Sequence, residues 1–308
     1  MRRLAPVLSA VAALAAPAPA ATQQGPPAPD APPLFRPEAR APVPDAPHLV
    51  DVSGSAPQAR DQAKHFFDPR ARADADDAAY VHPWAKRVAA ATAYARSRNG
   101  RVAFAAIDEK GRVRGWHVDE QHRSASLVKA MFLVAYLGRI PNRALTGADR
   151  SLLRPMIVRS DNNAATRVRN ITGPGRVYGV AKRSAMTRFV LKTRWGDTLI
   201  TAADQARLFA RIDLLVPKRH RAYARKLLAS IIPEQRWGVP RALPQGWRIF
   251  FKGGWRPLAG RNLVNQSALI EKGDRRVSLA VLTDENPTHE YGTETLRGVA
   301  RRVLRGLR

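Results

Sequence analysis

The sequence predicts an α+β fold with a five-stranded antiparallel sheet that is flanked by N- and C-terminal helices. A short (trimmed) all-helical lobe is inserted between the second and third strands. Strand-like patterns occur in two groups, within residues 101–118 and within residues 248–283. A long, mostly helical stretch separates these groups, and an amphipathic helical pattern stands at each end of the folded part. This order of elements is typical of an α+β domain, in which a site is expected in the cleft between sheet and lobe.

The N-terminus has the three parts of a secretory signal peptide. Arg2 and Arg3 form a charged start, an apolar stretch follows, and Ala18-Pro19-Ala20 is a small-residue cleavage site. We therefore expect a signal peptide over residues 1–20, cleaved near Ala20, and a protein secreted into a bacterial envelope. The apolar stretch is too short for a transmembrane anchor. Residues 21–79 are rich in Pro and Ala and predict a disordered linker, which leaves residues 80–308 as the folded domain.

The first predicted elements of the domain are a helix over 83–98 and strands over 101–107 and 112–118. Proline stands in the first turn of the helix, and Asn99-Gly100 ends it. The two strands are rich in Val, Phe and Trp, and a polar turn at 108–111 joins them.

The middle of the domain is mostly helical up to about residue 245. It begins with an apolar helix over 126–137, and Thr201 and Asp204 form a start similar to a capping box. The last helix carries one continuous apolar stripe, which we expect to pack on the sheet rather than on a membrane. The late strands and this helix are predicted at 248–252, 263–270, 276–283 and 294–307.

Composition excludes several classes of site. The chain has no cysteine, so it has no disulfide framework, thiolate zinc site or thiol nucleophile. The seven histidines lack metal-ligand spacing, and we predict neither a metal site nor a cofactor. The net charge is +27, and residues 1–78 hold only 8 of the 52 basic residues and 9 of the 25 acidic ones. The basic residues are mostly arginines in runs of at most two, which predicts a basic surface and no nucleic-acid partner.

The first motif with chemical content is Ser126-Leu-Val-Lys129, at the start of the apolar helix. Residues three apart on a helix share a face, and the positive end of the helix dipole favours developing negative charge on the serine oxygen. A buried lysine beside it has a lowered pKa and can act as a base. By itself the motif also has an ordinary explanation, a chance serine and lysine on one helix.

Two further motifs follow in the chain. In Ser160-Asp161-Asn162, a hydroxyl can relay a proton and an amide can bind a substrate amide, although Ser or Asp there also suits a helix cap. In Lys252-Gly-Gly-Trp255, the lysine offers a positive charge at a strand end, and the glycines let a substrate lie against the strand. The backbone N–H of Trp255 can pair with that of Ser126 as an oxyanion hole.

Together and in this order, the three motifs resemble the active-site serine penicillin-recognising enzymes, and class A β-lactamases most closely. The resemblance covers nearly all of residues 80–308. It implies that Ser126 is the acylated nucleophile and Lys129 its base, and that Ser160 shuttles a proton. It implies that Asn162 contacts the substrate amide, that Lys252 binds the substrate carboxylate, and that Gly254 and Trp255 line the site.

The sequence departs from the class A pattern in three places. The intervals from Ser126 to Ser160 and from Ser160 to Lys252 are short. Gly253 stands where the family usually has Thr or Ser. No E-x-x-L-N element, which supplies the deacylating glutamate in class A, lies between Asn162 and Lys252. The only carboxylates in that interval belong to Asp197, Asp204, Asp213 and Glu234.

The sequence therefore predicts a secreted serine hydrolase of the class A β-lactamase type, with an acyl-enzyme on Ser126 that hydrolyses slowly. The alternatives are a D-alanyl-D-alanine carboxypeptidase or related peptidoglycan amidase, and an acylatable or inert module that binds the cell wall. The partner is a small β-lactam or a peptidoglycan stem peptide, and we expect a monomer. Arg256 and Arg261 flank the late motif as additional candidates for binding a substrate carboxylate.

Overall fold

The computed structural model describes residues 81–308. The predicted signal peptide (1–20) and linker (21–79) lie outside the described residues. Among the helices of the described part, none is both long and apolar enough to span a membrane.

The predicted five-stranded antiparallel sheet is confirmed, with strand order β2-β1-β7-β6-β5. The first two strands and the last three strands of the chain meet where β1 pairs with β7 along its whole length. The strands are β1 (Arg101–Ile107), β2 (Val113–Trp116), β5 (Arg248–Leu258), β6 (Arg261–Lys272) and β7 (Arg275–Asn286). Strand β5, which carries the Lys-Gly-Gly motif, therefore forms one edge of the sheet.

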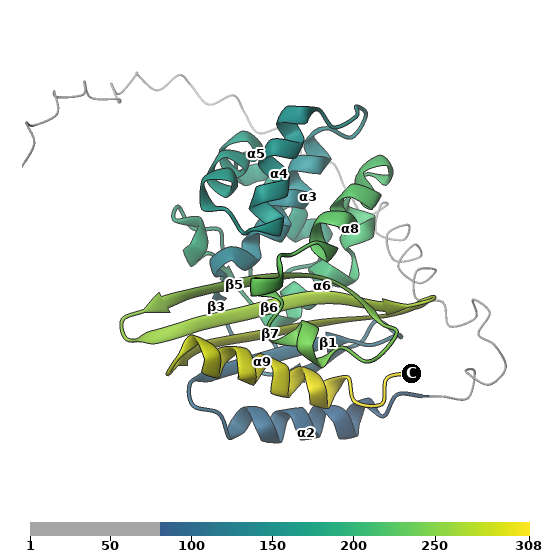
Figure 1. The fold of residues 1–308 in the computed structure, drawn as a ribbon, viewed down its shortest axis with the longest axis vertical. Helices are drawn as coiled ribbons and strands as arrows, with labels where there is room; N and C mark the ends of the chain where they lie inside the picture. The colour runs from purple at the N-terminus through teal and green to yellow at the C-terminus, as the bar shows by residue number, and fades with distance from the viewer. Residues whose placement is uncertain (1–80) are drawn as a thin grey trace, which may run out of the picture. The chain divides into compact units, whose positions relative to one another are not determined.

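Two helices cover one face of the sheet: α2 (Trp84–Arg96) and α9 (His289–Val303) lie side by side (Figure 1). Helix α9 contacts β6 and β7, as its apolar stripe predicts, and α2 contacts β1 and β2. Helix α9 begins five residues before its predicted start, because the Thr288 side chain accepts a hydrogen bond from Tyr291 N–H and caps the helix.

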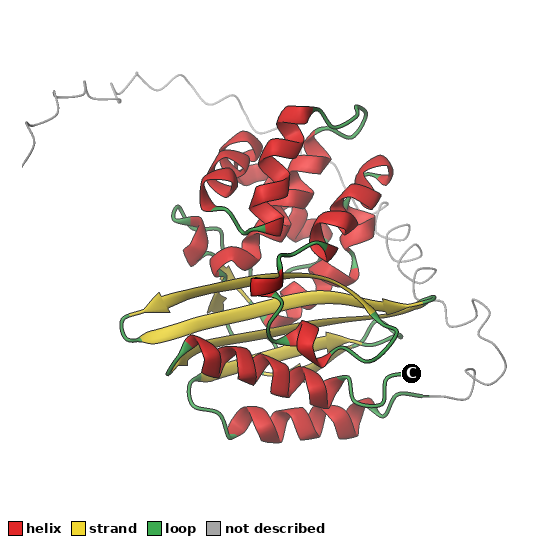
Figure 2. Ribbon diagram, viewed as in Figure 1, coloured by secondary structure: helices red, strands yellow, loops and turns green. Residues whose placement is uncertain are grey.

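The other face carries α6 and the helical lobe (Figures 1 and 2). Helix α6 (Ala202–Ala210) packs on β1, β6 and β7, and its Thr201 cap is confirmed. Within the lobe, α5 packs on both α3 and α4. The remaining elements of this half are α3 (Lys129–Arg139), α4 (Gly147–Val158), α5 (Asn162–Arg183), α7 (Ile212–Leu215) and α8 (Arg221–Ala229), the small sheet of β3 (His122–Arg123) and β4 (Leu199–Ile200), and the 3₁₀ turns η1 (Ala125–Val128), η2 (Trp195–Asp197), η3 (Lys218–His220), η4 (Pro233–Gln235) and η5 (Val239–Ala242).

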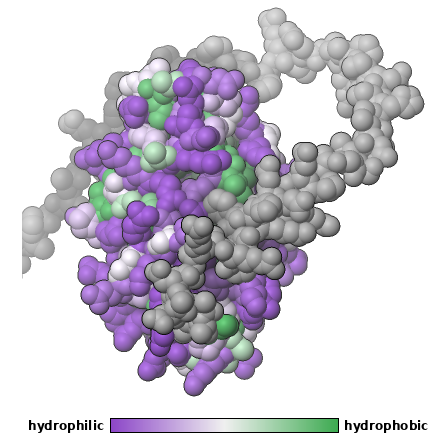
Figure 3. All heavy atoms as spheres, turned by 90° about the vertical axis from the view of Figure 1, so that its right-hand side faces the viewer, coloured by the Kyte–Doolittle hydropathy of each residue, from purple (hydrophilic) through white to green (hydrophobic). Residues whose placement is uncertain are grey.

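Helix α3 runs through the centre of the domain, and its residues from Lys129 to Leu137 are all buried. A helix that is apolar on every side must lie in a core, and this one packs against α5 and α4 within the lobe. The surface is by contrast largely hydrophilic on the face shown in Figure 3. Lys129 is the exception to the apolar pattern of α3, so its charged group needs a specific environment.

Candidate active site

Ser126 lies in η1 rather than in a continuous helix with Lys129, which corrects the predicted helix over 126–137. The two residues stand three positions apart across the junction of η1 and α3, where the backbone remains helical, so their side chains share one face. Ser126 is half-buried, and the residue before it, Ala125, has φ of 43°. A non-glycine residue in this left-handed region is strained, as is often found next to reactive groups.

Strand β5 approaches the Ser126 turn very closely at Gly254. A Cβ atom on Gly254 would lie 2.5 Å from the carbonyl oxygen of Ser124 and 2.9 Å from the backbone nitrogen of Ser126. Only glycine permits this contact, which brings the N–H of Ser126 and the strand segment at Trp255 to one junction. The glycine therefore makes room for the serine turn, and that it also makes room for substrate stays a prediction.

Lys129 is fully buried and donates to oxygen atoms from the Ser160–Asn162 segment. Its Nζ lies 2.6 Å from the carbonyl oxygen of Ser160, 2.7 Å from Oδ1 of Asn162 and 3.3 Å from Oγ of Ser160. Burial lowers the pKa of Lys129 from 10.5 to about 7, and the negative charge of Asp161 opposes part of this shift. About half of the molecules therefore carry a neutral amine at Lys129 near pH 7.

Lys252 is also fully buried and binds the same hydroxyl. Its Nζ donates to Oγ of Ser160 at 3.0 Å and to the carbonyl oxygen of Gly253 at 2.8 Å. Burial, together with the nearby charge of Lys129, holds the pKa of Lys252 well below its ordinary value. Ser160 itself has φ of 60°, a second strained residue at the site.

The two lysines and Ser160 form a chain along which a proton can move. A neutral lysine donates two hydrogen bonds and keeps one lone pair. Lys129 can use its two donors on the Ser160 carbonyl and on Asn162, so its lone pair is available to a hydroxyl proton. Ser160 can accept from Lys252 while it donates its own proton. This arrangement suits a base at Lys129 and a relay at Ser160.

A residue that the sequence analysis did not select, Trp195, covers Lys129. Its ring centroid lies 4.9 Å from Lys129 Nζ, and its Nε1 donates to Thr166 Oγ1 at 3.2 Å. Trp195 belongs to η2, which packs against η1 and hence beside the Ser126 turn. An indole ring in this place helps to keep water away from the amine. No local pattern around Trp195 predicts this contact, because the two residues are far apart in the chain.

The four carboxylates between Asn162 and Lys252 are differently placed. Asp204 accepts from the backbone N–H groups of Thr187 and Arg188, and it also binds Arg207. Asp213 pairs with Arg225 and Arg276.

The other two carboxylates belong to Glu234 and Asp197. Glu234 is exposed in η4. Asp197 lies on η2, the turn packed against the serine turn, and its carboxylate binds Arg256 in an ion pair. Of the four, Asp197 is thus the one carried by an element that the structure packs beside Ser126.

The other predicted residues fall into two groups. Asn162 meets Lys129, and Arg256 lies close by but is engaged by Asp197. Arg261 stands apart, because it is exposed at the start of β6 opposite Leu258, about 20 Å along the strand from Lys252. The structure therefore does not bring Arg261 to the Ser126–Lys252 cluster.

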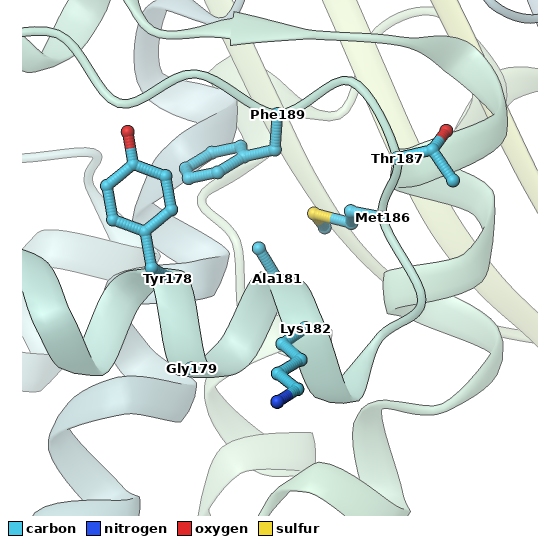
Figure 4. A pocket seen from close by; sticks show the side chains of 7 residues that line it. All are labelled: Tyr178, Gly179, Ala181, Lys182, Met186, Thr187 and Phe189. Atoms are coloured by element: carbon cyan, nitrogen blue, oxygen red, sulfur yellow. The ribbon is translucent and has the colours of Figure 1, made fainter. Parts of the chain in front are cut away.

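A separate hollow of about 440 Å³ lies at the end of α5 and the segment after it (Figure 4). None of the predicted site residues lines it, so it has no part in the chemistry above. Its lining residues are Tyr178, Gly179, Ala181, Lys182, Met186, Thr187 and Phe189. Within residues 81–308, no three His, Asp or Glu side chains are grouped to hold a metal ion.

Comparison with known proteins shows the same fold. Similar structures include a β-lactamase from Sphaerobacter thermophilus (20% identity, TM-score 0.62, covering 72% of this chain and 97% of the other) and a class A β-lactamase from Mycobacterium abscessus (23%, 0.59, 71% and 98%). A class A β-lactamase from Bacteroides cellulosilyticus matches at 14% identity with a TM-score of 0.63, covering 73% and 98%. Among curated proteins, no significant match was found.

The sequence model of the Beta-lactamase enzyme family matches residues 148–307, just over half of the chain. This match begins after Ser126 and Lys129, so the assignment of these two residues depends on their geometry and on the resemblance of their motif. The fold of the described domain and the match to the family lead to one conclusion: the chain belongs to the Beta-lactamase enzyme family and is a β-lactamase-like serine hydrolase.

Proposed function

We propose that the protein opens β-lactams through an acyl-enzyme on Ser126, and that the acyl-enzyme is hydrolysed slowly. The observation that carries the proposal is the pair of buried lysines on one hydroxyl, with Ser160 Oγ 3.3 Å from Lys129 Nζ and 3.0 Å from Lys252 Nζ. Two buried amines with lowered pKa values are costly to a fold and are typical of a functional site.

In the acylation step, the neutral amine of Lys129 takes the hydroxyl proton of Ser126 while its Oγ bonds to the lactam carbonyl carbon. The oxyanion that forms accepts hydrogen bonds from the backbone N–H groups of Ser126 and Trp255. The carbon–nitrogen bond then breaks as Ser160 gives its proton to the ring nitrogen. Ser160 recovers a proton from the Lys129 ammonium, which leaves an ester on Ser126. Lys252 supplies the positive charge that binds the substrate carboxylate.

Deacylation lacks comparable support. It needs a base that takes a proton from water near the ester, a contribution of about 10²–10⁴-fold. Asp204 and Asp213 are engaged elsewhere and Glu234 is exposed. Asp197 is near the serine turn, but its carboxylate is already engaged by Arg256 in an ion pair.

Intact-mass measurement with benzylpenicillin, beside a chromogenic cephalosporin assay, tests this function. We expect a persistent adduct of one penicilloyl group that maps to Ser126, absent from Ser126→Ala. Ser124→Ala is a matched control, because Ser124 lies two residues away and is fully buried with its hydroxyl on the carbonyl of Ala125. An adduct on Ser124 or Ser160 would refute the assignment.

The second candidate is a D-alanyl-D-alanine carboxypeptidase or related peptidoglycan amidase. The observation in its favour is that no carboxylate in the interval from Asn162 to Lys252 is both close to the serine turn and free of an arginine partner. Release of D-alanine from diacetyl-lysyl-D-alanyl-D-alanine, faster than hydrolysis of the cephalosporin, would favour it. For either substrate we propose a monomer that is exported by its N-terminal segment, and the mass of the mature protein from culture medium tests the cleavage near Ala20.

A further inference from the structure

The face of β5 that carries Gly253 is covered by the indole ring of Trp237. A Cβ atom on Gly253 would lie 3.2 Å from Cη2 and 3.6 Å from Cζ2 of this ring. The ring therefore occupies the space in which a side chain at position 253 would stand. This is the position of the hydroxyl residue in the class A pattern, so an aromatic surface replaces that hydroxyl.

Gln266 fixes the position of Trp237. Gln266 is the partner of Gly253 in the register of β5 and β6, so its side chain leaves the sheet on the same face. It is fully buried, its Nε2 donates to the carbonyl oxygen of Trp237 at 2.8 Å, and its Oε1 accepts from Val239 N–H at 2.7 Å. Both ends of one amide thus hold the backbone on either side of Gly238. The amide packs tightly against Gly238, since a Cβ on this glycine would lie 2.4 Å from Gln266 Oε1.

Trp237 also belongs to a group of three aromatic rings. Its ring centroid lies 5.6 Å from that of Trp255 and 5.3 Å from that of His289, with the ring planes nearly perpendicular. The three residues come from the segment before η5, from β5 and from the start of α9, and all are half-buried. Each of the three side chains is therefore partly exposed.

The aromatic group lies near the amine of Lys252, although the two belong to opposite faces of the strand. Along a strand, successive side chains alternate between faces, so Lys252 and Gly254 face the Ser126 turn while Gly253 and Trp255 face Trp237. Because β5 is the edge strand, a substrate that lies along it meets both sets of residues. Lys252 Nζ is only 5.9 Å from the centroid of the Trp255 ring.

We propose that Trp237, positioned by Gln266, is a specificity-determining residue that selects substrates with a planar aromatic group next to the carboxylate bound by Lys252. The inference depends on the proposed acylation of Ser126. Perpendicular and stacked contacts with an indole favour a flat conjugated group over a flexible aliphatic one. In cephalosporins, the substituent at C3 is next to the C4 carboxylate and is the group that would meet this wall.

Nitrocefin and cephalothin provide the test, because both carry a thienylacetamido group at C7 and they differ at C3. Nitrocefin has a conjugated dinitrostyryl group there, and cephalothin has an acetoxymethyl group. The measured quantity is the ratio of their second-order rate constants for acylation of the full chain, followed by stopped-flow absorbance and intact mass. Trp237→Ala should lower the nitrocefin-to-cephalothin ratio about tenfold, and Trp237→Phe should keep it within about threefold.

Two further variants separate specificity from folding. Gln266→Leu should lower the ratio in the same direction as Trp237→Ala, although it leaves the ring in place. Trp116→Ala removes another half-buried tryptophan, on β2 at the opposite edge of the sheet, and should leave the ratio unchanged. If Trp237→Ala fails to fold, Trp237→Leu keeps apolar packing and gives the same comparison.

The outcomes distinguish this inference from the function it depends on. The inference is supported if the nitrocefin-to-cephalothin ratio falls in the Trp237 and Gln266 variants and the size of the fall does not correlate with their melting temperatures. An unchanged ratio with intact acylation overturns the inference and leaves the proposed function standing. No adduct from either compound on the unaltered protein overturns the proposed function, and the inference with it.

Discussion

Acylation of Ser126 should rise about tenfold between pH 6 and pH 8, where Lys129 loses its proton. The reason is that burial lowers the pKa of Lys129 to about 7. With that pKa, the neutral fraction of the amine is about 0.1 at pH 6 and about 0.9 at pH 8. An ordinary lysine, with a pKa near 10.4, would give about a tenfold rise for each pH unit throughout this range.

The charge of Asp161 gives a way to move this curve. Asp161 raises the pKa of Lys129, against the larger effect of burial. Its side chain also caps α5 by accepting from Ala164 N–H at 2.7 Å. Asparagine keeps the capping ability and removes the charge. Asp161→Asn should therefore move the midpoint of the acylation curve to lower pH, with little change in the rate on the plateau.

Lys252 should set the other side of the profile. Its pKa is also held below the ordinary value, and it must be protonated to bind a substrate carboxylate. As pH rises through this lowered pKa, the charge is lost and binding weakens, so the second-order rate constant should fall at high pH. Stopped-flow acylation by nitrocefin from pH 5 to pH 10 measures both limbs. A rate that still climbs tenfold per unit above pH 8 would refute the assignment of Lys129 as a base neutral near pH 7.

The remaining predictions concern stability, steric fit and turnover. The pKa of Lys129 is lower in the folded than in the unfolded chain, so the unfolded chain binds more protons between about pH 7 and pH 10, and stability rises with pH in this range. Lys129→Met should therefore raise the free energy of unfolding, measured in urea, by about 2–4 kcal/mol at pH 6 and by much less at pH 9. Gly254→Ala should lower acylation by about 10²-fold or more, since its Cβ would meet backbone atoms, whereas Gly138→Ala, with open space around it, should be neutral or slightly stabilising. Cephalosporin hydrolysis should show a burst of one product equivalent and then a slow steady rate. In the Asp197→Asn and Glu234→Gln variants this steady rate should stay within about threefold of that of the unaltered protein. Fast turnover without a burst would contradict this prediction.

Much of the candidate site could be predicted because it depends on short spacings. Ser126 and Lys129 are three residues apart, and any helical backbone puts their side chains on one face. Ser160 and Lys252 belong to motifs whose order resembles that of a known family, and in the structure Lys252 donates a hydrogen bond to the Ser160 hydroxyl. The roles of the glycines were harder to predict from the local sequence. The atoms that fill the space beside a glycine come from parts of the chain that are distant in sequence.

Element boundaries show the same limit. The strand predicted to end at Lys252 continues to Leu258, although Gly253, Gly254 and Pro257 argue against a strand. Glycine and proline are tolerated there because β5 is an edge strand, with partners on one side only. Position in a sheet is a property of the whole fold, and the residues of β5 alone do not indicate it.

Two of the three departures from the class A pattern, Gly253 and the missing glutamate element, concern substrate binding and deacylation. The acylating groups come from the junction of η1, α3 and β5, which is held by the core and by the close contact at Gly254. The segment beside this junction is η2, where Trp195 covers Lys129 and Asp197 is engaged by Arg256. In the proposed function, Trp195 thus shields the neutral amine of Lys129 for acylation, while the carboxylate nearest to the serine turn, that of Asp197, is engaged by Arg256 and does not serve deacylation.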